Sequence, residues 1–371
     1  MNVHLWNAYN PKKISVEIRQ NLKDKLKEFI RNNLKKYAMK MNIQPTRLYE
    51  YFIWQKALIP LNVLMTLSKL AGISLIDMEK EIIQYKHLFV PNKNSVKKPN
   101  LPIKICPYFT SIISHLYFDG SVPKDGKGTY YNQKDRAIMQ DFVDKVKFVF
   151  GDVQYSIVKD HRGILKCRVP RIIGEICKSV YGIDSFGTFD SRISNKIFRL
   201  PKEHKIAFIL SAILDEGSIT YDGDIQFGVS NKRLCADVQQ LCSEIGLNPG
   251  AIKQKKNNEH YYFYIKDRER LLSFLNLFKI KYSLINIGFK EDRIRHFFKL
   301  KKFPGRNTKE AANGRRTKIL QSLAEKEKTV NELCLELLIP PRSLRRHLSI
   351  LVNKDNLSKK KRSIEYVYSL E

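Results

Sequence analysis

Two acidic residues stand in closely matching sequence contexts in the middle of the chain. Ile112–Val122 reads IISHLYFDGSV and Ile209–Ile219 reads ILSAILDEGSI, so Asp119 and Glu216 each follow an apolar stretch and precede Gly-Ser. Six residues after each acid comes an Asp-Gly pair, which is a strong β-hairpin signal because both residues tolerate positive φ. The shared pattern predicts that the two acids occupy equivalent positions in two copies of one unit.

A pair of carboxylates in equivalent positions is suited to phosphodiester cleavage. Carboxylate oxygens are the ligands that hard cations such as Mg²⁺ prefer, and a bound metal can activate water and stabilise the departing oxygen. A solvated acid at a helix end explains either residue alone more readily than it explains the symmetric pair. We therefore expect Asp119 and Glu216 to be catalytic and metal-binding, with Mg²⁺ or another divalent cation as cofactor.

The elements that must position these acids follow the same order in both copies. A helix, a hairpin, a second helix, a second hairpin and a third helix are expected in residues 105–200 and again in residues 201–302. The first hairpin leads into YYNQKDRAIMQDFVDKV in one copy and into FGVSNKRLCADVQQLCSEI in the other. The central region is therefore predicted to be α+β, with two αββαββα repeats.

This arrangement resembles the LAGLIDADG homing-endonuclease family in its single-chain, two-repeat form. The resemblance implies that the pseudo-symmetric repeats form a saddle on DNA, with the two motif helices packed at its centre. It also implies that Gln133 and Asn231 order water and that Lys281 stabilises developing charge. The first copy has no evident counterpart of Lys281, so the two halves are expected to be unequal.

The motif helices depart from the family pattern at the positions where they meet. Close approach requires small residues, which Ser114 and Ser211 provide. Phe118 and Asp215 stand where Ala or Gly is usual, so either the helices part slightly or these side chains turn aside. In the first motif helix His115 and Tyr117 are expected to pack or hydrogen-bond at the interface rather than to catalyse.

A helix, a tight turn and a second helix are predicted within the first 89 residues, which we expect to form an all-α domain. The turn falls at Asn42, because Asn tolerates the left-handed conformation. This stretch resembles the repressor-like helix-turn-helix family, whose second helix enters the major groove. The resemblance implies DNA contacts from Gln44, Thr46, Arg47, Tyr49 and Glu50. A helical bundle that serves only as a protein contact is the alternative.

The last segment, residues 316–371, shows three helical patterns followed by two strand patterns around a basic turn. It resembles a winged helix-turn-helix, with Pro340 and Pro341 opening the third helix. The resemblance implies groove contacts from the third helix and phosphate or minor-groove contacts from the wing. These residues are Arg342, Arg345, Arg346 and His347 in the helix, and Lys359, Lys360, Lys361 and Arg362 in the wing. Polar segments 90–104 and 303–315 are expected to be linkers.

Alternate side chains of the central strands are expected to read DNA in the major groove. The sequence leaves open which alternate set faces the DNA. The candidates are Lys124, Lys127, Tyr130, Gln154, Lys159, Arg168, Gln226, Lys253, Lys255, Tyr262 and Tyr264.

Composition favours a nucleic-acid partner over a membrane. The chain of 371 residues carries 67 Lys+Arg against 37 Asp+Glu, a formal charge of +30, which a polyanion would neutralise; a merely solvated basic surface is the alternative. No stretch approaches the roughly 20 apolar residues of a membrane span, and the beginning of the chain has no signal-peptide pattern. The six cysteines show no zinc spacing and are expected to be reduced and buried. A cytoplasmic, nucleoid-associated monomer is expected.

These observations lead to one function and two alternatives. The leading hypothesis is a site-specific endonuclease that binds double-stranded DNA and cleaves it with a divalent metal. The first alternative is a transcription regulator that uses an inactive core as a DNA clamp. The second is an RNA intron maturase, which the paired helix-turn-helix patterns disfavour.

Overall fold

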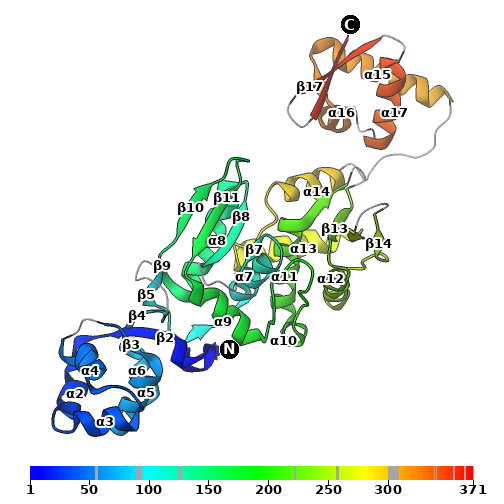
Figure 1. Ribbon diagram of the computed structural model, residues 1–371. Coiled ribbons are helices and arrows are strands. Elements are labelled where there is room, and N and C mark those ends of the chain that lie inside the picture. Colours follow the sequence, from blue (N-terminus) through cyan, green and yellow to red (C-terminus); the bar gives the residue numbers. More distant parts are fainter. Residues whose placement is uncertain are drawn as a thin grey trace.

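The computed structural model describes residues 1–371 except 55–56, 89–93, 124–127, 221–222, 256–258, 300–308, 338, 340, 354–355, 363–364 and 371. It is a mixed α/β protein in which helices and strands alternate along most of the chain (Figure 1). None of the helices in the described parts combines the length and apolar character needed to cross a bilayer. All six cysteines are free and buried, as expected from their spacing.

The N-terminal segment is residues 1–104, and its first 89 residues are not all-α as predicted, because they contain strands β1 to β4. Its elements are β1 (Asn2–Val3), α1 (Leu5–Ala8), the 3₁₀ helix η1 (Pro11–Lys13), β2 (Ile14–Ile18), α2 (Gln20–Arg31), α3 (Leu34–Lys40), α4 (Pro45–Leu48), the π-helix η2 (Tyr49–Ile53), β3 (Ile59–Pro60), α5 (Leu61–Leu70), α6 (Leu75–Lys80), β4 (Ile82–His87), β5 (Ser95–Pro99) and β6 (Ile103–Lys104). The alternation of Ile14, Val16 and Ile18, all buried, is a period-two strand signal. The predicted turn between α3 and α4 is confirmed, since Asn42 has a φ of 51°.

One sheet joins the N-terminal segment to the central region. Its strand order is β3-β2-β4-β5-β9, and β9 (Gly151–Val153) follows the second helix of the first repeat. Val96 of β5 pairs with Val153 of β9, and β1 pairs with β6. Much of the segment predicted to be a linker, residues 90–104, is therefore strand.

The central region contains two four-stranded antiparallel sheets, and the first has the order β7-β8-β11-β10. The strands of this sheet and the helices that accompany them are α7 (Pro107–Tyr117), β7 (Gly120–Ser121), β8 (Thr129–Gln133), α8 (Arg136–Phe150), β10 (Ser156–Lys159), β11 (Leu165–Val169), α9 (Arg171–Tyr181) and α10 (Asn195–Phe198). The second sheet has the matching order β12-β13-β15-β14. Its elements are α11 (Lys202–Glu216), β12 (Gly217–Ile219), β13 (Ile225–Val229), α12 (Lys232–Glu244), β14 (Lys253–Gln254), β15 (Tyr261–Ile265), α13 (Arg268–Lys281) and α14 (Phe289–Lys299).

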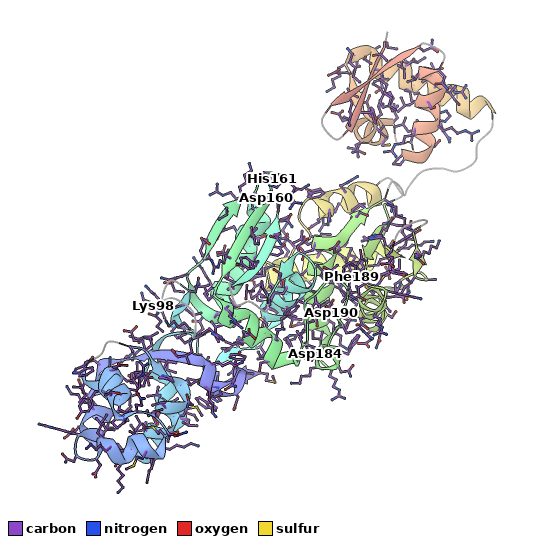
Figure 2. All side chains as sticks on the ribbon, viewed as in Figure 1. Lys98, Asp160, His161, Asp184, Phe189 and Asp190 are labelled. Carbon is purple, nitrogen blue, oxygen red and sulfur yellow. The ribbon has the colours of Figure 1, made fainter. Side chains whose placement is uncertain are left out.

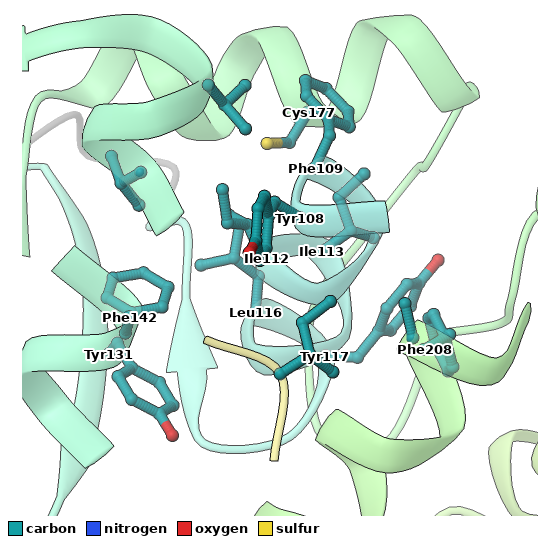
Figure 3. Packing of buried hydrophobic residues seen from close by; sticks show 14 of the residues in the cluster. Tyr108, Phe109, Ile112, Ile113, Leu116, Tyr117, Tyr131, Phe142, Cys177 and Phe208 are labelled. Carbon is teal, nitrogen blue, oxygen red and sulfur yellow. The ribbon is translucent and has the colours of Figure 1, made fainter. Parts of the chain in front are cut away.

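Helices α7 and α11 lie side by side between the two sheets (Figure 1). Every residue of α7 is buried, which is typical of a helix enclosed on all sides rather than on one face. Figure 3 shows Tyr131 and Phe142 on one side of α7 and Phe208 of α11 on the other. The ring of Phe118 packs edge-on against Phe208 of α11 and Phe227 of β13, with centroids 6.1 and 5.6 Å away, so this atypical side chain packs against the second motif helix from just beyond the end of α7.

The C-terminal segment consists of three helices and a three-stranded sheet of order β16-β18-β17. Its elements are α15 (Lys309–Glu325), β16 (Lys328–Thr329), α16 (Val330–Leu337), α17 (Pro341–Val352), β17 (Leu357–Arg362) and β18 (Glu365–Leu370). Ile319, Leu333 and Leu348, one from each helix, are fully buried. The first helix begins within residues 303–315, which had been predicted to be a linker.

Candidate active site and nucleic-acid interface

The two predicted acids lie at the ends of the paired helices. Glu216 is the last residue of α11, and Asp119 follows the C-terminal end of α7. The glycine after each acid permits a tight exit into the next strand. A Cβ on Gly120 would lie 2.6 Å from the Cα of Leu116, and one on Gly217 would lie 2.5 Å from the carbonyl oxygen of Ile213. The acid-Gly pairs therefore fix the position of each carboxylate at the end of its helix.

Three carboxyl groups gather at this point, because Asp215 lies beside the predicted pair. Burial raises the pKa of Asp119 to about 7, and the negative charge of Asp215 contributes. Burial likewise raises the pKa of Glu216 to about 7, with contributions from Asp119 and Asp215. Among the residues that the structure describes, no side chain donates a hydrogen bond to the Asp119 or Glu216 carboxylate. The site therefore keeps two partly exposed, repelling carboxylates without hydrogen-bonded partners.

The lysine at this site is Lys290, which sequence reasoning missed. Its Nζ donates hydrogen bonds to the carbonyl oxygens of Ile213 and Leu214, at 2.8 and 2.5 Å. Burial lowers the pKa of Lys290 to about 8, although the nearby carboxylates oppose this shift. Lys290 lies at the start of α14, where the sequence FKEDRIRH contains no signal that distinguishes it from other basic residues.

The expectation that Lys281 lies at the carboxylates is wrong. Its Nζ pairs with Glu203 at 3.1 Å, and the hydroxyl of Tyr282 donates to the same carboxylate. Glu203 stands in the first turn of α11, roughly 20 Å from Glu216 at a rise of 1.5 Å per residue. A regular helix separates the lysine from the acid that it was expected to serve.

Fully buried polar side chains connect the two motif helices beneath the acids. The Nδ1 of His115 lies 2.9 Å from Oδ2 of Asp215, and the hydroxyl of Tyr131 donates to Oδ1 of Asp215 at 2.8 Å. On the other side of the imidazole, Nζ of Lys145 lies 2.7 Å from Nε2. Lys145 also donates to Ser111. His115 therefore bonds at the interface, as its position on the motif helix suggested.

Other polar side chains of α7 form further hydrogen bonds close to this network. The hydroxyls of Ser111 and Ser211 lie 2.6 Å apart across the two helices, and Ser114 donates to the carbonyl oxygen of Phe208. The Tyr117 hydroxyl donates to the carbonyl oxygen of Arg192. The small residues thus allow a close helix approach, as predicted.

The two predicted water-ordering residues occupy different environments. The Asn231 side chain caps α12 by accepting from the backbone N–H groups of Arg233 and Leu234, and its Nδ2 donates to the carbonyl oxygen of Ser191. Gln133 ends β8, and its Nε2 lies 3.4 Å from the Tyr131 hydroxyl that bonds Asp215. Asn231 is therefore engaged in capping a helix, whereas Gln133 is linked to the carboxylate cluster.

The strand pairing determines which candidate DNA-reading residues share a face. Tyr131 and Cys167 are buried against the helices, so their neighbours in sequence, Tyr130 and Arg168, point to the opposite face, where they pair across the strands. The same alternation in the second sheet leaves Gln226, Tyr262 and Tyr264 on the face away from buried Phe227 and Phe263.

Basic side chains accompany these aromatic rings. Lys166 lies over the ring of Tyr130 at 4.2 Å, Lys253 pairs with Tyr262 across the strands, and Lys255 is exposed just beyond β14. Lys124 and Lys127 lie outside the described residues. At the far end of the first sheet, Asp160 and His161 mark the tip of the β10–β11 hairpin (Figure 2), with Lys159 on the exposed strand before it.

The Gln154 side chain is not on the strand face. It follows β9 and contacts the hydroxyl of Ser95, a residue of β5. Gln154 therefore contributes to the junction with the N-terminal sheet.

The flanking segments present their candidate residues on two short helices and a hairpin. Gln44, Thr46, Arg47 and Tyr49 are exposed around α4, and Arg47 pairs with Glu50 at 2.6 Å. Arg346 is exposed and Arg345 partly so on α17, whereas His347 is buried, so His347 does not face the groove as expected.

In the wing, Lys359, Lys360 and Lys361 are exposed on β17, and Lys359 lies over the ring of Tyr366 at 3.9 Å. The side chains of Arg342 and Arg362 lie outside the described set.

Comparisons with known proteins identify one segment. The family model described as bacterial regulatory protein, arsR family, matches residues 313–355, which contain α16 and α17. The archaeal Lon protease of Pyrococcus abyssi (strain GE5 / Orsay) is 36% identical over 58 residues, 16% of this chain and 6% of that protein. The chain thus spans only a small part of this relative.

The similar solved structures share a lower sequence identity with this chain. I-DmoI in complex with DNA and Mn shares 16% identity, with 49% of this chain and 97% of that chain covered and a TM-score of 0.33. Full-length DUF199/WhiA from Thermatoga maritima shares 13% identity over 67% of this chain and 90% of that chain, with a TM-score of 0.36. Likenesses of this degree decide neither fold nor activity. The arsR-type match supports a C-terminal helix-turn-helix and DNA as the partner.

Proposed function

We propose that this protein is a site-specific endonuclease that binds double-stranded DNA and hydrolyses it with the help of Asp119 and Glu216. The observation that carries the proposal is the pair of equivalent, partly exposed carboxylates between two sheets. Their raised pKa values indicate that they are held together despite repulsion and burial. Two carboxylates that share a site raise each other's pKa, and perturbed titratable groups are typical of functional sites.

The donor chemistry of this pair fits Mg²⁺. Among the described residues no group of three or more His, Cys, Asp or Glu side chains is arranged as a complete metal site. Mg²⁺, however, is usually bound through one or two carboxylates and completes its coordination with water and substrate phosphates. Asp119 and Glu216 would hold the ion, which when bound supplies activation of water and stabilisation of the departing oxygen.

The remaining residues of the site would bind and orient DNA. The two sheets would form one saddle-shaped surface, with Tyr130, Arg168 and Gln226 on the face toward the duplex. Lys290 would offset negative charge that accumulates at the scissile phosphate. The helices of the two flanking segments would lengthen the footprint and raise the effective concentration of the core on its site. We expect a monomer, because the internal repeat supplies both halves of the site.

A selection followed by a cleavage assay tests this function. Duplexes that the full-length protein binds are first selected from a randomised pool, and the recovered sequences are then incubated with the protein and Mg²⁺. Asp119→Asn and Glu216→Gln are the test variants, and Asp237→Asn is the matched control, since Asp237 is a buried carboxylate that pairs with Arg192 instead.

We expect cutting of the selected duplex by the wild type and by the control, and binding without cutting by the two test variants. Equal cutting by Asp119→Asn, or cutting without added metal in the presence of EDTA, would contradict the proposal.

A transcription regulator is the second candidate, and the arsR-type match at residues 313–355 favours it. Tight, salt-sensitive binding of the selected duplex without cutting at any divalent metal would identify this function. Preference for a structured RNA over the duplex in competition would instead favour the intron maturase.

A further inference from the structure

The buried chain beneath the carboxylates has a defined order of donors and acceptors. Lys145 can only donate, so Nε2 of His115 accepts its hydrogen bond, 2.7 Å away. The imidazole proton is then on Nδ1 and is donated to Asp215, 2.9 Å away. Tyr131 donates to the second oxygen of Asp215. The result is a positive and a negative end joined through a neutral imidazole.

Asp215 is close to the proposed metal ligands but inaccessible to a metal. The side chains of His115 and Asp215 have 0% exposure, and Lys145 has 1%. Asp215 nevertheless immediately precedes Glu216, and its charge acts on both Glu216 and Asp119. A charge at this position therefore reaches the site through space rather than by ligation.

Helix packing alone does not account for this arrangement. Apolar side chains of similar volume often stabilise a protein interior as well as a buried ion pair does, or better. The two helices already have the Ser111–Ser211 contact at 2.6 Å. The buried charges thus call for a role beyond holding α7 against α11.

We propose that Asp215, a buried carboxylate that accepts hydrogen bonds from His115 and Tyr131, is a positioning residue that strengthens the binding of a divalent cation by Asp119 and Glu216 without ligating it. The three carboxylates outnumber the two buried lysines, Lys145 and Lys290, by one. Replacing Asp215 with a neutral residue removes this excess of negative charge. The inference rests on the proposed function, because it presumes that the pair binds a cation.

Two substitutions at opposite ends of the chain should change metal affinity in opposite directions. Asp215→Asn should weaken the binding of Mn²⁺ by about 10- to 100-fold, the range typical for residues that support metal ligands from the outer shell. Lys145→Gln removes a positive charge while keeping a hydrogen-bond donor, so it should tighten Mn²⁺ binding. Loss of packing alone would weaken binding in both variants.

The measurement is calorimetric titration of Mn²⁺ into the full-length protein without DNA, at one fixed pH of about 7.5, between the pKa of about 7 for Asp215 and the pKa of about 8 for Lys145. Asp237→Asn is the control for the loss of a buried carboxylate and should bind Mn²⁺ as the wild type does. Asp215→Glu should retain the wild-type affinity because it retains the charge. DNA binding in EDTA should be unchanged in every variant, which also shows that each one is folded.

The outcomes separate the two proposals. A wild type that binds no Mn²⁺, with or without DNA, overturns the metal-dependent function itself. A wild type that binds Mn²⁺ while Asp215→Asn binds it equally well overturns only the role of Asp215, as does weakening by both Asp215→Asn and Lys145→Gln. If Asp215→Asn does not fold, the sign of the Lys145→Gln effect decides.

Discussion

The carboxylate of Asp119 is kept in a position that disfavours its charged form. Its pKa is raised to about 7 in the folded protein, against about 4 in an unfolded chain. The folded state therefore binds the proton more tightly, and the stability penalty grows as the pH rises from about 4 to about 7 and is complete above that. The burial of this carboxylate therefore costs stability, a trade that is common at functional sites.

Asp119→Asn should therefore stabilise the metal-free protein, and the gain should be larger at alkaline than at acidic pH. Thermal unfolding in EDTA at about pH 8.5 and about pH 5 measures both values. We expect a melting temperature several degrees above wild type at the higher pH and a smaller difference at the lower. An equal or lower melting temperature at alkaline pH would mean that the carboxylate is not repelled in the folded state.

Lys290 should matter for cleavage and Lys281 should not. Lys290→Met removes the only ammonium group found among the described residues within reach of both carboxylates, and loss of one charge-stabilising donor typically lowers kcat by about 10²- to 10³-fold. Lys281→Met is the matched control, because Lys281 pairs with Glu203 at the opposite end of α11. Single-turnover cleavage at saturating protein compares them, and equal rates for the two variants would reject a role for Lys290.

At the scale of elements, the turn from α11 into β12 fixes Glu216. Gly217 has ordinary backbone angles, with φ −74° and ψ 145°, but an added methyl group would lie 2.5 Å from the backbone oxygen of Ile213. Gly217→Ala should thus shift the helix end, destabilise the protein by about 1–3 kcal/mol and reduce cleavage. Gly250→Ala is the control, since its nearest neighbour would be 3.6 Å away. Denaturant unfolding and cleavage together test this, and wild-type behaviour of Gly217→Ala would contradict it.

The elements also show where sequence reasoning succeeded and where it stopped. The acid-Gly repeat placed Asp119 and Glu216 at matching helix ends because a local pattern encodes a local turn. The sequence predicted a linker at β5, because its partner β9 lies in a distant part of the chain and because Pro99 and the preceding lysines look like loop residues. Lys290 and Lys145 escaped notice for the same reason: only the folded chain brings them to the carboxylates.

At the scale of the whole molecule, the sheet shared through β5 and β9 makes the N-terminal segment part of the core. Removing residues 1–104 would deprive β9 of its pairing partner and expose Val153, which is 3% exposed in the full chain. We expect this truncation to be insoluble or to melt well below the full chain. Removing residues 309–371 should leave the melting of the remainder nearly unchanged, because the C-terminal sheet contains only its own strands. Comparable melting of both truncations would show that the shared sheet contributes little.

The formal charge of the whole chain, +30, predicts that phosphate contacts dominate its affinity for DNA. Substitutions in the wing measure how much of this affinity the wing contributes. Lys360 and Lys361 are exposed on β17, and each phosphate contact that is lost lowers the slope of log K against log salt by about 0.9. Lys360→Gln combined with Lys361→Gln should therefore reduce the slope by about 2 and weaken binding similarly for all duplex sequences. Fluorescence anisotropy across a salt series measures the slope. If the wing instead reads bases in the minor groove, the double variant will lose affinity mainly for the selected duplex, and the slope of log K against log salt will scarcely change. In either case, cleavage at saturating protein should stay at the wild-type rate, because the carboxylates are untouched.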